Sequence, residues 1–165
     1  MKFSEIEDFQ DFVNLKRDLI VTYLSSYKDM EDYYYKNPED VERYIEWLFN
    51  HNQETSIIIV ATHNNRVIGF IAGDRYYYDK QEEDYVINLH ELVVISEYRG
   101  LGIATHLINE FIAISRRKNK KQGRKVNGVI LWVGKDNHRA QKLYKNLGFT
   151  YQTKVGKWLK MMMKL

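Results

Sequence analysis

The sequence has no cysteine and only one proline among its 165 residues. The absence of thiols excludes disulfides, thiolate metal ligands and a cysteine nucleophile. No stretch approaches the ~18 to 20 consecutive apolar residues that span a bilayer. The first twenty residues carry charged side chains throughout, unlike the apolar stretch of a signal peptide. We therefore expect a cytoplasmic protein with no membrane partner.

The composition that remains is typical of a globular protein. Hydrophobic residues make up 44% of the chain and charged residues 28%, which argues against disorder. No internal repeat, proline-rich stretch or linker interrupts the sequence. We expect a single domain over residues 1–165, a length sufficient for one hydrophobic core.

Charge is distributed unevenly along the chain. Residues 1–50 hold 6 basic and 12 acidic side chains, a balance of −6, whereas residues 51–165 hold 19 and 10, a balance of +9. Seven of the ten residues from Arg116 to Lys125 are basic. A helix C-terminus, where the helix dipole favours cations, is the simplest interpretation of this segment. No aromatic and glycine signature of RNA binding accompanies it, so we expect no nucleic-acid partner.

Hydrophobic periodicity predicts an α+β fold built on a mixed sheet. Asn37 and Pro38 read as a helix cap and a first helical residue, and Asn64-Asn65 as a hairpin turn. The expected elements are a helix over 8–27, a helix over 38–50, strands over 56–61, 67–72 and 85–95, a helix over 103–115, a strand over 126–133, a helix over 137–147 and a hairpin over 149–165.

The segment after the third of these strands is the most informative. Arg99-Gly100-Leu101-Gly102 joins a strand to a helix that begins near Ile103. Glycines allow the main chain to approach a ligand closely, and the unpaired N–H groups of a helix N-terminus attract phosphate. Arg99 adds a formal positive charge at the same place. A glycine turn that only joins a strand to a helix remains the alternative.

Two common phosphate-binding motifs do not fit this segment. Thr105 stands where a dinucleotide-binding loop needs its third glycine, and residues 116–126 contain no acid to bind a ribose. A nucleoside-triphosphate loop needs Gly-Lys-Ser/Thr, which occurs nowhere in the chain.

A second motif follows about thirty residues later. It is Asn137-x-x-Ala140-x-x-x-Tyr144-x-x-x-Gly148-Phe149. Together with Arg99-x-x-Gly102-x-Ala104 it resembles the GCN5-related N-acetyltransferase (GNAT) superfamily, over roughly residues 88–149. The order of the expected elements also matches that family, although residues 1–6 show only a weak version of its opening strand.

The resemblance implies a GNAT-type domain, with a mostly antiparallel sheet splayed at an acetyl-CoA site and helices on both faces. It implies acetyl-CoA as a co-substrate, with no metal, and transfer of the acetyl group to an amine. The strand segment before the loop would bind the pantetheine arm, and the loop and helix start the pyrophosphate. Carried over by position, the coenzyme-binding residues are Leu92, Val93, Val94, Arg99, Gly100, Leu101, Gly102, Ile103, Ala104, Thr105, Asn137 and Tyr144.

Acetyl transfer needs a base for the amine and an acid for the leaving thiolate. Tyr144 matches the family's tyrosine that often protonates the thiolate, although a packing role is the alternative. Asn137 either binds the coenzyme or caps its helix. For the base, we weigh Glu91, His90 and a chain of waters. Because adjacent strand residues point to opposite faces, we expect only one of these two side chains to face the acceptor.

The other histidines, His51, His63, His106 and His138, lack the spacing of metal ligands, and we interpret them as surface residues. The tyrosine triplets Tyr33-Tyr34-Tyr35 and Tyr76-Tyr77-Tyr78 either line an acceptor pocket or belong to the core or rim.

The acidic first third of the chain predicts that a small cationic amine, such as a polyamine or an aminoglycoside-like compound, is the acceptor. The acids concerned are Asp29, Glu31, Asp32, Glu39, Asp40, Glu42 and Glu46. Capping and solubility are the alternative role for them. A protein acetyltransferase and a non-catalytic coenzyme-binding module are competing functions. We expect a monomer or a homodimer.

Overall fold

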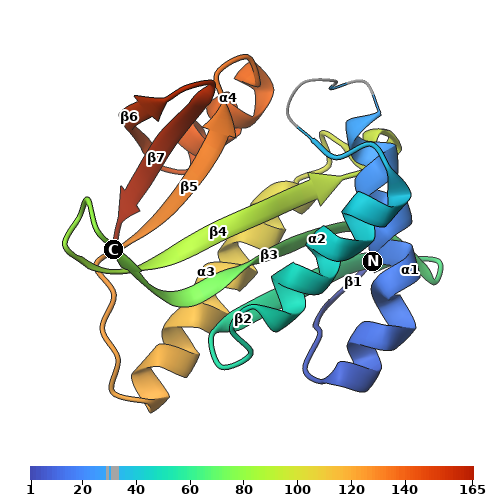
Figure 1. Cartoon of the computed structure of the whole chain (residues 1–165), viewed down its shortest axis with the longest axis horizontal. Helices are drawn as coiled ribbons and strands as arrows, with labels where there is room; N and C mark the ends of the chain where they lie inside the picture. Colours follow the sequence, from blue (N-terminus) through green and yellow to red (C-terminus); the bar gives the residue numbers. More distant parts are fainter. Residues whose placement is uncertain (29, 31–33) are drawn as a thin grey trace.

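The computed structural model of the chain describes residues 1–28, 30 and 34–165. Its elements, in chain order, are β1 (Lys2–Glu5), α1 (Phe9–Tyr27), α2 (Pro38–Asn50), β2 (Ser56–His63), β3 (Arg66–Asp79), β4 (Asp84–Val94), the 3-10 turn η1 (Ser96–Tyr98), α3 (Ile103–Lys121), β5 (Gly128–Gly134), α4 (His138–Asn146), β6 (Thr150–Val155) and β7 (Trp158–Lys164). They build one mixed sheet with helices on both faces (Figure 1), which confirms the predicted fold class.

The sheet has seven strands in the order β1-β2-β3-β4-β5-β7-β6. All neighbouring strands are antiparallel except β4 and β5, which run parallel. The parallel pairing covers only Ile87 to Leu89 of β4. Beyond it, β4 continues to Val94 and β5 to Gly134 without pairing with each other, and the two strands diverge (Figure 1). The sheet is therefore open at the carboxyl ends of its two central strands.

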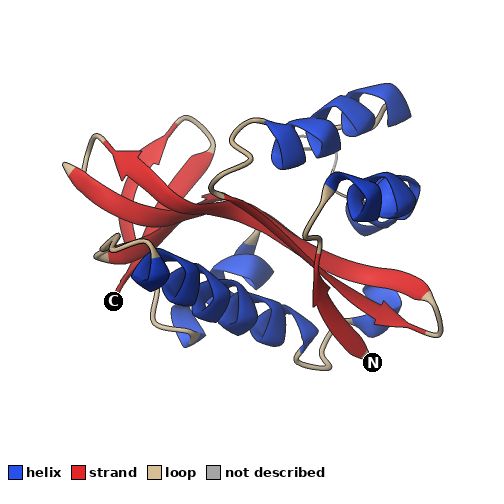
Figure 2. Ribbon diagram, turned by 90° about the horizontal axis from the view of Figure 1, so that it is seen from below, coloured by secondary structure: helices blue, strands red, loops and turns tan. Residues whose placement is uncertain are grey.

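Helices lie on both faces of the sheet, as Figure 2 shows, and a hydrophobic layer holds them on each face. On one face, α1 and α2 bury residues such as Leu19 and Ile45 against Phe70 of β3. On the other face, α3 buries Leu107 and Phe111 in a cluster with strand residues from β2 to β5. Both β3 and β4 are buried on both faces over most of their length, and residues 67–73 of β3 form a continuous run without a polar side chain.

One glycine allows α3 to lie close to the sheet. A Cβ added to Gly73 of β3 would lie 2.3 Å from the carbonyl oxygen of Asn88 and 2.7 Å from Cζ of Phe111. Only a residue without a side chain lets these atoms approach so closely. This contact fixes α3, and with it the loop that precedes the helix.

The two N-terminal helices begin where the sequence predicts. The side chain of Asp8 accepts a hydrogen bond from the backbone N–H of Asp11 at 2.8 Å, and Asn37 accepts one from Glu39 at 2.8 Å. Pro38 occupies the first position of α2. Side-chain oxygens at these positions satisfy N–H groups that have no partner within a helix.

Three elements differ from the expectation. Residues 2–5 do form a strand, which pairs antiparallel with β2. The third strand, β3, runs to Asp79, well beyond residue 72. The third helix continues to Lys121, because lysine and arginine favour helix even where no apolar stripe continues. The basic segment therefore does include a helix C-terminus, as interpreted.

Within the described ranges, the structure has no helix that is long and apolar enough to span a bilayer.

Candidate active site

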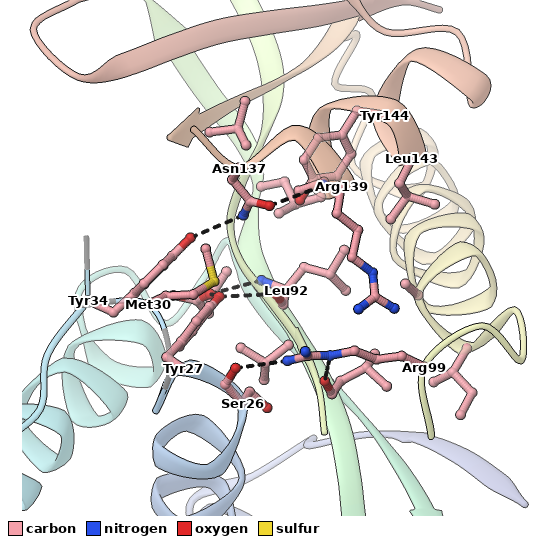
Figure 3. A pocket seen from close by; sticks show the side chains of 18 of the residues that line it. Ser26, Tyr27, Met30, Tyr34, Leu92, Arg99, Asn137, Arg139, Leu143 and Tyr144 are labelled. Atoms are coloured by element: carbon pink, nitrogen blue, oxygen red, sulfur yellow. Dashed lines mark hydrogen bonds between the residues drawn. The ribbon is translucent and has the colours of Figure 1, made fainter. Parts of the chain in front are cut away.

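A cavity of about 840 Å³ opens where β4 and β5 diverge. We call it the cleft cavity. The residues that line it come from α1, the segment between α1 and α2, α2, the end of β4, the glycine loop, the start of α3, the end of β5 and α4. Figure 3 shows how side chains from these separate elements converge on it.

The glycine loop forms one end of the cleft cavity. Gly100 and Gly102 line it with φ angles of +77° and +80°, values that side chains rarely permit. A Cβ built on either glycine meets nothing within 4 Å. Gly102 immediately precedes α3, a helix of nineteen residues that begins at Ile103. The first N–H groups of this helix therefore lie beside open space, an arrangement suited to phosphate.

Arg99 is held in place by main-chain oxygens on both sides of the cavity. Its Nε donates to the carbonyl of Val94 at 2.8 Å, and its Nη2 donates to the carbonyl of Ser26 at 2.8 Å. In Figure 3 this side chain crosses from the loop to the end of α1, while Arg139 extends into the cavity from α4. Two arginine side chains thus line the cavity.

Most of the predicted coenzyme-binding residues line this one cavity. They are Leu92, Val93, Val94, Arg99, Gly100, Gly102, Ile103, Ala104, Thr105, Asn137 and Tyr144. Leu101 is the exception: its side chain is 66% exposed and does not line the cavity. Its place between two glycines with positive φ turns it outward.

The start of α4 forms the opposite wall. Oδ1 of Asn137 accepts a hydrogen bond from the N–H of Ala140 at 3.2 Å, so this residue caps the helix. Its Nδ2 also donates to the Tyr34 hydroxyl at 3.5 Å, across the cavity (Figure 3). Tyr144 lies two turns further on, buried against Phe149, and lines the cavity. Burial raises the pKa of the Tyr144 phenol above its usual value, and the charge of Glu91 raises it further.

A β-bulge changes the expected geometry of His90 and Glu91. In the pairing with β3, Glu91 lies opposite Ala72 and Leu89 opposite Gly73, so His90 is the extra residue. Both side chains consequently lie on the face of α1 and α2, and both line the cleft cavity. The expectation that only one of them faces this side is wrong, because a bulge interrupts the alternation of a regular strand.

Glu91 is a buried carboxylate surrounded by hydroxyl donors. Oε1 accepts from the Tyr27 hydroxyl and from the N–H of Leu92 at 3.2 Å, and Oε2 accepts from the Tyr44 hydroxyl at 3.0 Å. The side chain is 7% exposed. Burial raises the pKa of Glu91 to about 7, although the hydrogen bonds from the two tyrosines and the Leu92 N–H oppose the rise. A carboxylate in such surroundings is suited to accepting a proton.

His90 belongs to a cluster of three side chains, the His–Asp–His trio. Asp74 of β3 is 5% exposed, and its Oδ2 lies 2.8 Å from Nε2 of His90 and 2.8 Å from Nε2 of His51, which follows α2. Burial alone would raise the pKa of Asp74, but the hydrogen bonds from the two histidines outweigh it and hold that pKa below its usual value. The interpretation of His51 as a simple surface residue is therefore wrong.

Several cavity residues were missed by the sequence reasoning. They are Tyr27, Tyr44, Trp132, Arg139 and Trp158 in the cleft cavity, with His51 and Asp74 beside it. For Arg139 a signal existed, because it lies inside the second motif. The others come from α1, α2, β3, β5 and β7, far apart in sequence, and only the tertiary structure brings them together.

Comparison with known proteins agrees with these two motifs. The sequence profile of the acetyltransferase (GNAT) family matches residues 22–149 of the chain. A protein of Archaeoglobus fulgidus named as an uncharacterized N-acetyltransferase is 32% identical over 141 residues, which cover 86% of each chain. The chain belongs to the acetyltransferase (GNAT) family.

A second relative is longer than this chain. It is an uncharacterized N-acetyltransferase of Methanocaldococcus jannaschii, 33% identical over 159 residues. The match covers 96% of this chain but only 64% of the relative.

Solved structures show the same GNAT fold. A protein of Pyrococcus horikoshii OT3 superposes with a TM-score of 0.79 at 25% identity, covering 99% of both chains. An N-acetyltransferase of Thermoplasma acidophilum, solved in complex with coenzyme A, superposes with a TM-score of 0.72 at 19% identity over the whole of both chains.

The family fold does not place the predicted acidic residues at the cavity. Asp40 pairs with Arg43, and Lys16 of α1 pairs with Glu42 at 2.9 Å and with Glu46 at 3.0 Å. None of these, nor Glu39, lines the cleft cavity. Asp29, Glu31 and Asp32, like Tyr33, lie outside the described residues.

The two tyrosine triplets have different locations. Tyr34 and Tyr35 line the cleft cavity. Tyr76, Tyr77 and Tyr78 lie at the far end of β3, where Tyr76 stacks on Tyr85 at 4.1 Å, and they do not line the cleft cavity.

Proposed function

We propose that this protein is an acetyl-CoA-dependent N-acetyltransferase that transfers the acetyl group to a primary amine by direct attack. One observation carries the proposal. A single cavity has a phosphate-type glycine loop at one end, a buried carboxylate at the other and a buried tyrosine in its wall. Coenzyme binding by the Thermoplasma relative of the same fold supports it.

The coenzyme side needs to bind a pyrophosphate and position a thioester. The N–H groups at the start of α3 and the loop from Arg99 to Gly102 would hold the pyrophosphate. Arg139 adds charge from the opposite wall. The main chain of β4 from Leu92 to Val94, which lacks a β5 partner, would bind the pantetheine arm.

The chemistry then divides between two side chains. Glu91 takes a proton from the amine, and the nitrogen lone pair attacks the thioester carbon to form a tetrahedral oxyanion. As this intermediate collapses, the carbon–sulfur bond breaks and Tyr144 donates a proton to the thiolate. The nitrogen gives up its second proton, which replaces the one that Tyr144 donated, and the neutral amide forms. An ordinary phenol pKa of about 10 exceeds the ~8.5 of a thiol, and the raised pKa of Tyr144 keeps its proton on the oxygen until the thiolate forms.

We propose a cationic primary amine as the acceptor. The acceptor end of the cavity presents the Glu91 carboxylate beside the rings of Tyr27, Tyr34 and Tyr44. An ammonium group is stabilised by such a carboxylate and by aromatic faces. The paired acids on α2 do not contribute to this preference.

The test is a panel of amines assayed by release of free coenzyme thiol. Polyamines, aminoglycosides and neutral amines of similar size are compared at equal concentration, with Glu91→Gln as the variant. Turnover of a cationic amine that is at least about 100-fold lower in the variant supports the proposal. Wild-type protein that binds acetyl-CoA but acetylates no member of the panel is a coenzyme-binding module instead.

A protein amine is the second candidate acceptor. A further cavity is lined by Leu89, His90, Trp132, Val155 and Trp158, and it shares four of these residues with the cleft cavity. Trp132 and Val155 are exposed. Exposed apolar side chains beside an active site suit a peptide. Peptides with a free N-terminus or an internal lysine therefore belong in the panel, and their preferential use would select this candidate.

A further inference from the structure

The structure assigns a divalent metal site to the His–Asp–His trio, with Zn²⁺ as the ion that fits. One atom from each of His51, Asp74 and His90 would be a ligand, and these atoms all lie within 4.8 Å of one another. The residues come from the end of α2, from β3 and from the bulge of β4, so the site exists only in the folded chain. The inference does not depend on the proposed acetyl transfer.

The donor set matches the preference of zinc. Imidazole nitrogens and a carboxylate oxygen bind Zn²⁺ at about 2.0 to 2.2 Å, and three protein ligands leave a position for water or another ligand. Bonds of that length at a tetrahedral angle separate two ligand atoms by about 3.3 Å. The Nε2 atoms now lie 2.8 Å from Oδ2 of Asp74, and the three ligand atoms span up to 4.8 Å, so the ion would draw the two imidazole rings together by more than about 1 Å.

The hydrogen bonding of His51 is the second observation that points to a cation. Its Nδ1 lies 2.7 Å from the carbonyl oxygen of Trp47, which can only accept a hydrogen bond. Its Nε2 lies 2.8 Å from both carboxylate oxygens of Asp74, which also accept when ionised. With Nδ1–H donated to the carbonyl, Nε2 turns its lone pair toward the carboxylate, and a metal ion would join these two groups. Donation of Nδ1–H to a carbonyl is the usual outer contact of a metal-binding histidine.

The surroundings orient all three ligands. The Thr55 hydroxyl donates to Oδ1 of Asp74 at 3.3 Å. The Trp47 ring stacks on His51 at 4.1 Å and meets His90 edge-on at 5.1 Å. Such packing fixes the imidazole rings with their Nε2 atoms toward one point. Through His90, the site adjoins both the cleft cavity and the smaller cavity beside it.

The experiment uses the full chain without a histidine tag, made metal-free by a chelator, and without coenzyme. Zn²⁺ is titrated by calorimetry, and Co²⁺ is titrated as a spectroscopic probe, because its visible absorption reports coordination by nitrogen and oxygen. We expect one equivalent to bind. His51→Gln should weaken binding by at least about 100-fold, beyond the ~10- to 100-fold typical of losing an outer contact.

The control is His106→Gln, an exposed histidine of α3 whose Nε2 lies 4.0 Å from Glu110. This variant should bind both metals like the wild type. Asp74→Asn is the second test, and because it can disturb folding, circular dichroism accompanies it. No stoichiometric binding by the wild type, or equal binding by His51→Gln, would overturn the site and leave the trio as an ion pair. Either result would leave coenzyme binding and amine turnover unaffected, so the two proposals fail separately.

Discussion

The two ends of the cleft cavity are built in different ways. The coenzyme end uses short continuous segments, the loop from Arg99 to Gly102 and the first turns of α3 and α4. The acceptor end uses single side chains from α1, α2 and β4, backed by β3, and few of them are neighbours in sequence. A local motif can therefore identify the coenzyme end, whereas the acceptor end depends on tertiary packing.

The largest expected effect is at the acceptor end. Glu91→Gln keeps the size of the side chain but removes the group that accepts the amine proton. We expect turnover to fall by ~10²- to 10⁴-fold, with the dissociation constant for acetyl-CoA unchanged in calorimetry. Glu97→Gln, at an exposed residue of η1, is the control. A matching loss of coenzyme affinity would show that the two ends are not separable.

The Tyr144→Phe substitution tests whether Tyr144, in the wall between the two ends, donates the proton to the thiolate. Removing the hydroxyl should lower turnover by up to ~10²- to 10⁴-fold when thiolate departure limits the rate. Single-turnover kinetics with saturating acetyl-CoA measures this step. Tyr151→Phe, at a 57% exposed tyrosine of β6, should behave like the wild type. If single turnover in Tyr144→Phe equals that of the wild type, the tyrosine only packs against Phe149.

A substitution in the glycine loop should affect coenzyme binding first. Gly102→Asp places a side chain and a negative charge at φ +80° beside the proposed pyrophosphate site. Like charges in contact cost several kcal/mol, so we expect affinity for acetyl-CoA to fall by about 100-fold or more.

The matched control for this loop is Gly123→Asp. Gly123 has φ +66°, no atom within 4 Å of an added Cβ, and no place in the cleft cavity. It therefore reproduces the backbone strain without the electrostatic conflict. Equal coenzyme affinity in the two folded variants would remove the assignment of the phosphate site.

The smallest expected effect concerns the acids of α2. Glu42 and Glu46 are part-exposed partners of Lys16, and pairs of this kind contribute at most about 1 kcal/mol. A double variant with Glu42→Gln and Glu46→Gln, which removes both charges, should change kcat/KM for a cationic amine by less than about threefold. The assay is run at low and high salt, because screening at physiological ionic strength extends over ~8 Å. A tenfold loss that disappears at high salt would show that these acids do attract the cationic acceptor.

The sequence was sufficient for the element order because the apolar periods and caps are local. The Asn37-Pro38 start of α2 and the glycine loop before α3 are examples. The sequence did not predict the direction of the His90 side chain, because a bulge inserts one residue without a signal in the composition. The sequence did not predict the contact between His51 and Asp74 for another reason. These residues are 23 positions apart in the chain, one at a helix end and one on a strand. The outward direction of the Leu101 side chain could not be predicted either, because a motif does not state which way each side chain points.

The short parallel ladder between β4 and β5 has a consequence for hydrogen exchange. Beyond Leu89, the amides of β4 that point away from β3 have no strand to bond with, and the Leu92 N–H bonds to the Glu91 side chain instead, so we expect these amides to exchange faster. Amides of β3 and of the antiparallel half of β4 are protected by the ladder, whatever the cavity contains. The amides of β4 should therefore exchange at two different rates. The faster set should respond to a molecule bound in the cleft cavity. Protection gained along that edge on adding acetyl-CoA would trace the path of the bound molecule residue by residue.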